Sequence, residues 1–316
     1  MNKTETIKIM NEYGKSSKPF KFLISFDMQN NIISDLNDDI FQIKINQNQQ
    51  KSINSRKIKF EKYPINYCDY QNAFNFVVKN LKYGNSYLLN LTFPTKIQMN
   101  YSLNDIFINS IAKYKVMLEN KFVCFSPETF IKINQNKIYS YPMKGTIDAD
   151  IPNALQIITD DKKETAEHYT IVDLIRNDLS IVSKNVRVER FRYADLIQTN
   201  TKKLYQISSE ICGDLPENYN ENLGDLIFAL LPAGSITGAP NKKTVEIILE
   251  AEKYERGFYT GIAGVYDGKN LDSCVLIRFI EKSDNDYYFK SGGGITIYSD
   301  CESEYNELID KVYVAF

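Results

Sequence analysis

Short apolar runs of strand character recur along the whole chain, and they do not alternate regularly with helices. A parallel sheet built from strand–helix–strand units would require that alternation. The sequence therefore predicts an α+β fold with largely antiparallel sheets. No stretch rich in Pro, Gly and Ser divides the 316 residues, which favours a single domain over residues 1–316. The predicted strands are 20–27, 40–45, 57–63, 86–93, 123–125, 129–133, 137–141, 261–266, 274–281 and 287–290.

Helical periodicity fills the intervals between these runs. The strongest helix is predicted over 162–181, where Ile171, Leu174 and Ile175 fall on one stripe and charged residues occupy the other faces. Another is predicted over 69–82, with Gly84 as its stop signal. Further helices are predicted over 103–111, 223–231, 242–254 and 303–313.

The chain contains one histidine, His168, and carries a net charge of −2 with a pI near 5.7. This charge argues against a nucleic-acid-binding protein, which would usually present a basic face. A single histidine excludes a His-rich zinc site and leaves Ser–His or Cys–His catalysis to His168 alone. Acid–base chemistry in an enzyme of this composition would rest mainly on Glu, Asp, Lys or Tyr.

The cysteines indicate a reducing compartment. Their number is odd, they are widely spaced and no two form a C-x-x-C pair, so free thiols are expected rather than disulfides or a zinc site. Residues 1–13 contain no apolar run of signal-peptide type, and no segment approaches the roughly 18–20 apolar residues of a membrane helix. We therefore expect a cytoplasmic protein without membrane attachment. The cysteines are Cys68, Cys124, Cys212, Cys274 and Cys301.

Two pairs of glutamates share the spacing E-x-x-E. Glu164 and Glu167 lie on the strongest predicted helix, and Glu304 and Glu307 lie on the last one. Residues three apart point to one side of a helix, so carboxylates from two helices could share a hard cation. Mg²⁺ usually needs one or two carboxylates, with waters and substrate oxygens completing its shell. The alternative is a solvated helix face in each case.

Two segments rich in small residues could bind an anion. Ser291 precedes three glycines, whose N–H groups could form an anion-binding concavity, although a bulged hairpin turn fits the same sequence. The loop 232–240 leads into a helix and could present free N–H groups, or could simply connect two helices. It lacks the Lys-[Ser/Thr] ending of a phosphate loop, which excludes a nucleoside triphosphate site of that kind.

Two basic residues occupy unusual positions. Lys144 lies between Pro142 and Gly145 after a strand, where it could act as a nucleophile if burial lowers its pKa, or could be an exposed charge. Arg278 falls inside the apolar run 275–280. A buried arginine needs a partner, which could be a ligand carboxylate or an internal Asp or Glu.

Together these segments resemble the chorismate-utilising enzymes, a family that includes anthranilate synthase component I, isochorismate and salicylate synthases, and aminodeoxychorismate synthase component I. The resemblance runs from about residue 20 to the C-terminus and implies a layered sandwich of two antiparallel sheets with helices outside. It rests on several motifs that occur in the family's order. These are Ser-Pro-Glu at 126–128, 142–146, Ala-Glu-His at 166–168, 172–178, 234–240, Ile-Arg at 277–278, 292–295 and 304–311.

The resemblance implies roles for individual residues. Glu167 and Glu307 would be Mg²⁺ ligands, with Glu164 and Glu304 supporting them through waters. Glu128 would be the general acid that expels the ring's C4 hydroxyl. Chorismate is a small dianion, so its recognition needs a few cationic and N–H donors rather than a large basic surface. The implied substrate-binding residues are Arg278, Lys311, Gly292, Gly293 and Gly294, with Thr146 and Thr237 nearby.

The residue type at position 144 distinguishes the branches of the family. Anthranilate synthases carry a small residue at this position, whereas aminodeoxychorismate synthases resemble this chain in carrying Lys. The resemblance implies that the lysine attacks C2 of chorismate, after which ammonia enters at C4 and yields 4-amino-4-deoxychorismate for p-aminobenzoate and folate synthesis. Isochorismate synthases instead have a water-activating Lys where this chain has Leu88, and many amino-transferring members have Gln there, so Leu88 departs from both patterns. The rival interpretations are anthranilate synthase component I and an inactive chorismate-binding or regulatory subunit.

The chain also departs from the family at defined positions. Tyr205 stands where a histidine is common at the edge of the active site, and is expected beside the substrate. Residues 1–60 are reduced relative to longer members, so inhibition by tryptophan is not expected. No glutaminase signature is visible, which implies ammonia from a separate glutamine amidotransferase subunit. His168, next to Glu167, is expected to be structural or to support the metal site.

Overall fold

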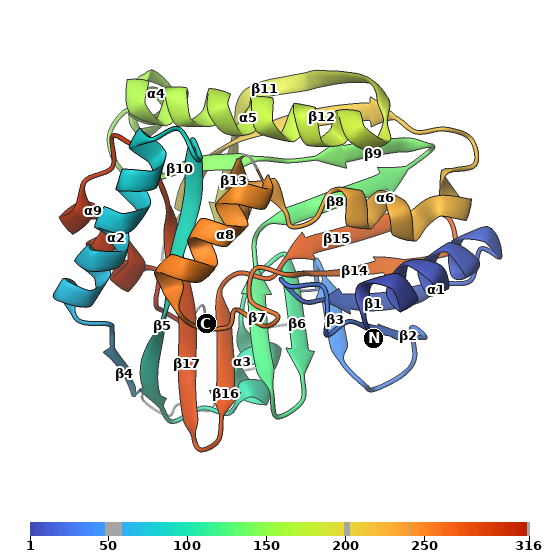
Figure 1. Cartoon of the computed structure of the whole chain (residues 1–316), viewed down its shortest axis with the longest axis horizontal. Coiled ribbons are helices and arrows are strands. Elements are labelled where there is room, and N and C mark those ends of the chain that lie inside the picture. Colours follow the sequence, from blue (N-terminus) through green and yellow to red (C-terminus); the bar gives the residue numbers. More distant parts are fainter. Residues whose placement is uncertain (48–58, 199–202, 240, 315–316) are drawn as a thin grey trace.

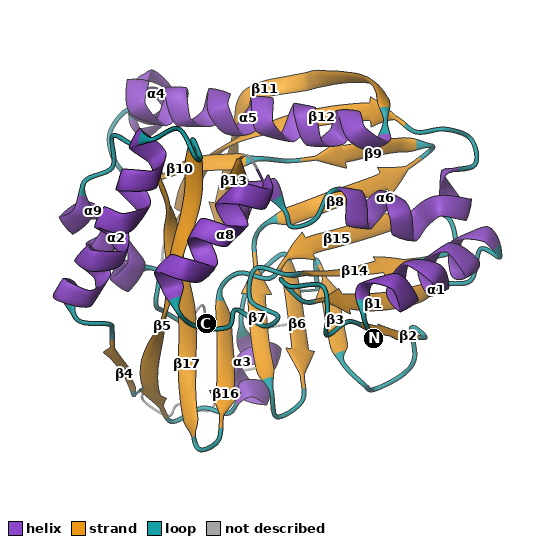
Figure 2. Ribbon diagram, in the orientation of Figure 1, coloured by secondary structure: helices purple, strands orange, loops and turns teal. Residues whose placement is uncertain are grey.

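A computed structural model describes residues 1–47, 59–198, 203–239 and 241–314 of the chain. Two antiparallel sheets form the centre of the molecule, and helices pack outside them (Figures 1 and 2). This confirms the predicted α+β sandwich. No helix within the described ranges is both long enough and apolar enough to cross a bilayer.

The first sheet is nine-stranded in the described residues. All of its strand pairs are antiparallel, and β11 joins it by pairing with β12. Its order is β10 (Met143–Asp148), β12 (Lys203–Asp214), β9 (Lys137–Ser140), β8 (Thr129–Asn134), β15 (Leu271–Val275), β14 (Ile262–Tyr266), β1 (Phe20–Ile24) and β2 (Ile32–Ser34), with β11 (Lys184–Gln198) beside β12.

The second sheet is eight-stranded in the same part of the chain. It is also antiparallel throughout, and β5 pairs with both β17 and the short strand β4. Its order is β13 (Gly238–Ala239), β5 (Leu88–Met99), β17 (Asp286–Ile295), β16 (Phe279–Ser283), β7 (Phe122–Ser126), β6 (Tyr114–Leu118) and β3 (Gln42–Ile45), with β4 (Phe60–Tyr63) beside β5.

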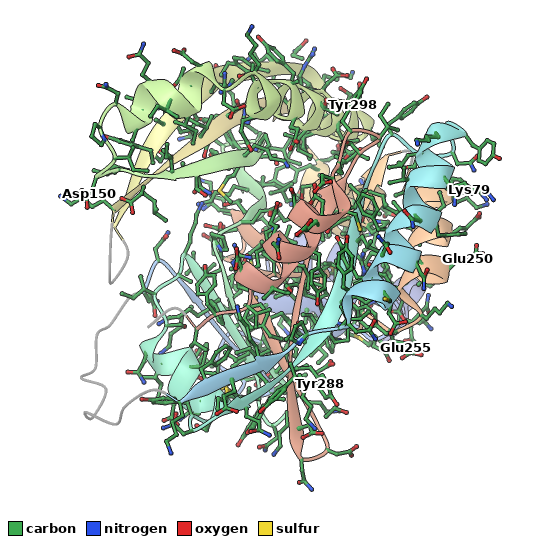
Figure 3. The ribbon with its side chains drawn as sticks, turned by 90° about the vertical axis from the view of Figure 1, so that its left-hand side faces the viewer. Lys79, Asp150, Glu250, Glu255, Tyr288 and Tyr298 are labelled. Carbon is green, nitrogen blue, oxygen red and sulfur yellow. The ribbon has the colours of Figure 1, made fainter. Side chains whose placement is uncertain are left out.

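Helices cover the outer side of each sheet. In Figure 1, α4 and α5 lie above the β10–β12–β9 part of the first sheet, and α2, α8 and α9 lie beside β5 and β17. Lys79 of α2 and Glu250 of α8 point away from the sheet into solvent (Figure 3). The helices are α1 (Lys3–Lys15), α2 (Tyr67–Lys82), α3 (Leu103–Asn109), α4 (Ala154–Asp160), α5 (Lys162–Val182), α6 (Leu223–Ala229), α7 (Gly234–Thr237), α8 (Asn241–Glu252) and α9 (Cys301–Asp310).

The core has separate parts because each sheet buries two faces. The inner faces meet where Leu23 and Cys274 of the first sheet pack with Phe122 and Phe279 of the second. The outer face of the first sheet packs against α1, α5 and α6, and β5 packs against α2, α8 and α9. Burial on both faces explains why many strands appear in the sequence as continuous apolar runs.

The strand predicted over 274–281 is wrong, because the run divides into β15 and β16, which belong to different sheets. Both halves are buried, so the apolar run continues across the junction. Arg278 lies at the junction with φ of +54°, a left-handed conformation, and is therefore not a strand residue as predicted. The chain changes sheets at this arginine.

Several elements escaped prediction. Helix α1 is polar, although Asn2 and Glu5 form a capping box at its start that marks a helix N-terminus. The long β11–β12 hairpin carries charged residues on much of its length. The glycines after Ser291 lie inside β17 rather than in a hairpin turn. The predicted strand at 57–63 is described only from residue 59, and β4 begins at Phe60.

All five cysteines are free thiols, as expected. Cys124, Cys212 and Cys274 are buried, whereas Cys68 is exposed. Burial raises the pKa of the Cys124 and Cys274 thiols, which keeps them protonated and unreactive. These two cysteines therefore act as small apolar residues of the core.

Candidate active site

A cavity of about 720 Å³ lies where the ends of the two sheets approach each other. It is large enough for a small organic ligand. Its walls come from β5, β10, α5, the α7 region, β17, α9 and the segment that follows α9. Twelve of the predicted site residues line it, namely Glu128, Lys144, Thr146, Glu164, Glu167, Arg278, Gly292, Gly293, Gly294, Glu304, Glu307 and Lys311.

The two glutamate pairs face this cavity from separate helices. Asp161 caps α5 by accepting a hydrogen bond from the Glu164 N–H at 2.9 Å, and so fixes the first turn of that helix. A Cβ added to Gly145 would lie 3.1 Å from Glu164 Oε2, and one added to Gly293 would lie 3.1 Å from Glu304 Oε2. One glutamate of each pair therefore lies close to a glycine, where no side chain covers the main chain.

The chemistry of the donor set suits a hard cation. No group of three or more Asp, Glu, His or Cys side chains in the described ranges is already gathered around a metal position. Mg²⁺ does not require one, because it is commonly held by one or two carboxylates with waters and substrate oxygens. The glutamates of α5 and α9 supply carboxylate oxygens from two walls of one cavity. The residues present thus fit Mg²⁺.

Lys144 reaches the cavity through an irregularity in β10. Met143 pairs with Ser208 and Thr146 pairs with Gln206, so one extra residue is accommodated between them, and Gly145 adopts φ of +78°. Such a bulge redirects the side chains next to it. The Lys144 Nζ donates to Glu167 Oε2 at 2.7 Å.

The environment of Lys144 differs from the one expected. Burial by itself would lower the pKa of the ammonium group, but the attraction and hydrogen bond of Glu167, with Glu164 and Glu307 nearby, raise it above its usual value. Lys144 is therefore a charged group in this state, and the expected lowering by burial is overcome by its carboxylate neighbours.

Two further cations lie on the opposite wall. Lys311 pairs with Glu307 at 2.5 Å and donates to the Gly292 carbonyl at 2.8 Å. Burial lowers the pKa of Lys311. The guanidinium of Arg278 lies 5.4 Å from the centre of the Tyr313 ring, and its buried Nε has no hydrogen-bond partner among the described atoms. This donor is therefore available to an acceptor on a ligand.

The three glycines lie in a strand rather than in a loop, and they present main-chain groups without side chains. Gly292, Gly293 and Gly294 pair with Thr92, Leu91 and Asn90 of β5. β16 stops pairing with β17 at Lys290, so in the described sheet the other edge of the glycine segment has no strand beside it. That edge lies along the cavity.

Glu128 lies where the chain leaves the second sheet at the end of β7 and enters the first at β8. Its Oε1 accepts a hydrogen bond from Ser235 Oγ at 2.6 Å, and its main-chain carbonyl accepts from Val275 N–H. Burial raises the pKa of this carboxyl although Ser235, Arg278 and Lys144 act in the opposite direction. A carboxyl whose pKa is raised beside a ligand cavity suits a general acid.

Two of the predicted site residues do not line the cavity. Thr237 is fully buried, and its Oγ1 has no partner in the described structure. Tyr205 pairs with Ile147, whereas its neighbour Gln206 faces the cavity opposite Thr146. Adjacent side chains of a strand point to opposite faces, so Gln206 faces the cavity and Tyr205 does not.

His168 is also outside the cavity lining. Its Nε2 lies 2.7 Å from Ser209 Oγ, and the ring is buried against Phe191. Burial, with Arg192 and Lys144 nearby, lowers its pKa to about 4. The ring is therefore neutral at physiological pH and links α5 to β12.

Other lining residues were missed because no motif marks them. Tyr259 and Tyr313 are aromatic residues in the walls, and Asn90 and Lys290 are polar residues on the two paired strands. Asn90 could have been found, since it lies two residues from Leu88 and strand periodicity puts both on one face. Nothing local in the sequence marks Tyr313, which reaches the site through the course of the chain after α9.

Comparison with known proteins agrees with this geometry. The model of the chorismate binding enzyme family matches residues 12–316. The chain is 49% identical over 313 residues to an uncharacterized PabA-like protein of Haemophilus influenzae, covering 98% of this chain and 95% of that protein. It is 31% identical over 264 residues to aminodeoxychorismate synthase component 1 of Salmonella typhimurium, covering 78% of this chain and 56% of that protein.

A solved structure shares the fold. MenF, the menaquinone-specific isochorismate synthase of Escherichia coli, superimposes with a TM-score of 0.69 at 15% identity. The alignment covers 98% of this chain and 80% of that one. At this identity the likeness concerns the fold alone.

Proposed function

Because this chain belongs to the chorismate-binding enzyme family, we propose that it is an aminodeoxychorismate synthase component I, which converts chorismate and ammonia to 4-amino-4-deoxychorismate and water. The observation that carries the proposal is Lys144, which projects from the bulge in β10 into the cavity. A small residue there would leave no nucleophile, whereas an amine can attack the ring.

In the proposed first step, the neutral Lys144 amine attacks C2 of the ring. The C1=C2 double bond shifts to C1=C6, the C5=C6 double bond shifts to C4=C5, and the C4–O bond breaks. The ammonium proton of Lys144 must first pass to solvent, and its 2.7 Å hydrogen bond to Glu167 Oε2 must break. Glu128, on another wall of the cavity, donates its proton to the departing oxygen, which leaves as water.

In the second step, ammonia attacks C4, both ring double bonds shift back to C5=C6 and C1=C2, and the C2–N bond to Lys144 breaks. The amine of Lys144 takes the electron pair of that bond. Leu88 supports amination over hydration, because it places an apolar side chain in the wall and offers no group that could activate water. The enolpyruvyl side chain takes no part.

The substrate's two carboxylates would be held from different walls. Arg278 offers an Nε with no other partner in the described structure, and Lys311 lies beside the open edge of the glycine segment. A charge-assisted hydrogen bond from a buried guanidinium is about twice as strong as a neutral one. We propose that these two residues orient the ring, with Thr146 nearby.

We also propose a Mg²⁺ site at the carboxylates of α5 and α9. Glu167 and Glu307 would hold the ion, with Glu164 and Glu304 beside them. The bound ion would neutralise a substrate carboxylate and compete with Lys144 and Lys311 for their glutamate partners. Support comes from the oxygen donors that meet in one cavity and from the glycine backbone opposite each pair.

Ammonia would come from a separate glutamine amidotransferase or from free ammonium. A glutaminase of the usual kind needs a reactive cysteine with a histidine base. The single histidine is buried, and its Nε2 is hydrogen-bonded to Ser209. The described part of the chain shows no Cys–His pair of this kind.

Trapping a covalent adduct tests this proposal. The enzyme is mixed with chorismate and Mg²⁺ without ammonium, quenched, and examined by intact-protein and peptide mass spectrometry. We expect an added mass equal to chorismate less one water on the peptide that contains Lys144, and its loss after ammonium is added. An enzyme that aminates chorismate while Lys144 stays unmodified at every time point would refute the nucleophilic role.

A further inference from the structure

A second, much smaller cavity adjoins the first. Its volume is about 20 Å³, and it lies between β8, β9, α5 and the start of α7. A water molecule needs roughly 10–15 Å³ in this measure, together with polar partners. The Ser140 and Ser235 hydroxyls donate to the Phe130 carbonyl and to Glu128, and their oxygens can still accept, so the small cavity has room and partners for one water.

The two cavities share a wall that contains Glu128, Pro142 and Ser235. Glu128 is thus accessible from both sides, and the Ser235 hydroxyl contacts its Oε1 at 2.6 Å. When a ligand fills the larger cavity, that side of Glu128 is covered. The small cavity then remains as the second route between Glu128 and solvent.

Asp178 of α5 forms the far wall of the small cavity. A Cβ added to Gly234 would lie 2.5 Å from Asp178 Oδ2, so the glycine makes room for the carboxyl. Asp178 is only partly buried, which leaves it open to exchange with solvent. Burial raises the pKa of this carboxyl to about 6, within the range in which a group can both accept and release a proton near neutral pH.

We propose that Asp178 supplies protons to Glu128 through the Ser235 hydroxyl and one water in the small cavity. The inference rests on the proposed general-acid role of Glu128. It assigns a proton-transfer function to a residue outside the substrate cavity. Asp178 does not touch the substrate and acts only through Glu128.

We call the path from Asp178 through the water and Ser235 to Glu128 the relay. It is needed because the reaction consumes a proton. Glu128 gives one proton to the C4 oxygen, which leaves as water. The incoming ammonia brings three hydrogens, and an amine of this kind is protonated near neutral pH. If the product leaves as its ammonium form, each turnover consumes one proton from solvent. The Glu128 carboxylate recovers it from Ser235, Ser235 from the water, the water from Asp178, and Asp178 from solvent.

Few charged side chains line the small cavity through which the proton would pass. Glu128 and Asp178 are the only Asp, Glu, Lys or Arg side chains among the residues that line the small cavity. Tyr141 is the other titratable group there, and burial raises its pKa, so it stays neutral. On the side of the larger cavity, Arg278, Lys144 and Lys311 act on Glu128 and favour its carboxylate form.

The kinetic test compares Asp178→Asn with Asp173→Asn, a matched change on an exposed part of the same helix. We expect Asp178→Asn to lower kcat at least about tenfold, since proton transfer by a positioned group contributes on the order of 10²–10⁴. KM for chorismate should not change, and the solvent deuterium isotope effect on kcat should rise. Ser235→Ala should behave like Asp178→Asn. Equal kcat and isotope effects in Asp178→Asn and Asp173→Asn would overturn the relay.

A second measurement does not depend on amination. In a Lys144→Ala background with chorismate bound, the infrared band of the protonated Glu128 carboxyl is followed after transfer to deuterated water, with Glu128→Gln to assign it. We expect exchange at least about tenfold slower when Asp178→Asn is added. Unchanged exchange would contradict the relay even if the wild type forms aminodeoxychorismate. A wild type that forms none would contradict the proposed function and leave the exchange result to decide the relay.

Discussion

At the scale of single residues, the cavity walls hold ionisable groups in unusual states. Glu128 and Asp178 are carboxyls whose pKa burial raises, whereas the Lys144 ammonium is kept charged by Glu167. Keeping a carboxyl out of water costs stability unless partners compensate. Such groups in a cavity are typical of sites where protons move.

Asp178 allows a direct measurement of that cost. Its pKa is raised from 3.8 to about 6. Between these values the folded state keeps a proton that the unfolded state has released, so stability falls as the pH rises. Above about pH 6 the wild type carries the full penalty.

We therefore expect Asp178→Asn to be more stable than the wild type at pH 7, by about 1–3 kcal/mol at roughly 1.4 kcal/mol per pKa unit. The gain should disappear below about pH 4, where both states of the wild type are protonated. Urea unfolding at several pH values measures it. A variant less stable than the wild type at pH 7 would show that the carboxylate is well satisfied in the folded state.

Lys144→Ala addresses the proposed nucleophile. We expect loss of aminodeoxychorismate formation of the order of 10²-fold or more, because no other amine in the described cavity occupies the bulge of β10. Chorismate binding should survive, since Arg278 and Lys311 remain. Product chromatography and isothermal titration with chorismate give the two readouts. Turnover equal to that of the wild type would rule out covalent catalysis by this residue.

At the scale of elements, the helices that carry the glutamate pairs were predictable, whereas the polar helix α1 and the strand ends were not. α5 and α9 repeat their apolar residues at helical spacing and start at capping aspartates, Asp161 and Asp300. Both glutamate pairs could therefore be placed from sequence. Lys144 and Tyr205 depend on strand register, which the bulge in β10 shifts by one residue. Such a shift depends on pairing partners distant in sequence.

The short strand β13 is the element most dependent on one glycine. Gly238 has φ of +106°, and a Cβ there would lie 1.8 Å from the Leu88 carbonyl oxygen. β13 pairs with Leu88 and Leu89 of β5, and so attaches the α7 region, with Ser235, to the second sheet.

We expect Gly238→Ala to cost roughly 2–6 kcal/mol, from backbone strain and overpacking together. Gly84→Ala is the matched control. It also has a positive φ, +75°, but its added Cβ would meet no atom within 4 Å. Strain alone should then cost about 1–2 kcal/mol. Denaturant unfolding of both variants separates backbone strain from overpacking. Equal losses of stability would show that the close contact with Leu88 adds nothing to the cost.

At the scale of the whole molecule, the site forms where the chain changes sheets. Glu128 lies at the crossing from β7 to β8, and Arg278 lies at the crossing from β15 to β16. The crossings are hydrogen-bonded to each other, Phe125 N–H to the Arg278 carbonyl and Val275 N–H to the Glu128 carbonyl. The antiparallel α+β character was predictable from the irregular alternation of elements, and the two-sheet sandwich from the resemblance to the family. The two crossings were not predictable from the sequence, because the strands of both sheets are buried. The apolar run of 275–280 therefore continues through the crossing at Arg278.

Arg256 connects the two sheets elsewhere. It is fully buried and bonds Glu252, the Asn90 carbonyl of β5 and Thr260, which precedes β14. Arg256→Met would leave the Glu252 carboxylate buried without its charge partner, and we expect a loss of about 3–5 kcal/mol.

Lys243→Met is the control for that variant. Lys243 forms an exposed pair with Glu246, and such pairs contribute about 0–1 kcal/mol. Thermal and urea unfolding compare the two variants. A small effect in both would mean that the polar contacts of Glu252 with Thr92 satisfy its charge without the arginine.

The identity of the product tests the proposed activity most directly. The purified protein is incubated with chorismate, ammonium and Mg²⁺ without any lyase, and the product is analysed by liquid chromatography with mass spectrometry. The proposal predicts chorismate with its C4 hydroxyl replaced by an amino group and its enolpyruvyl side chain retained. Fluorescent anthranilate, or an isomer of unchanged mass, would contradict it.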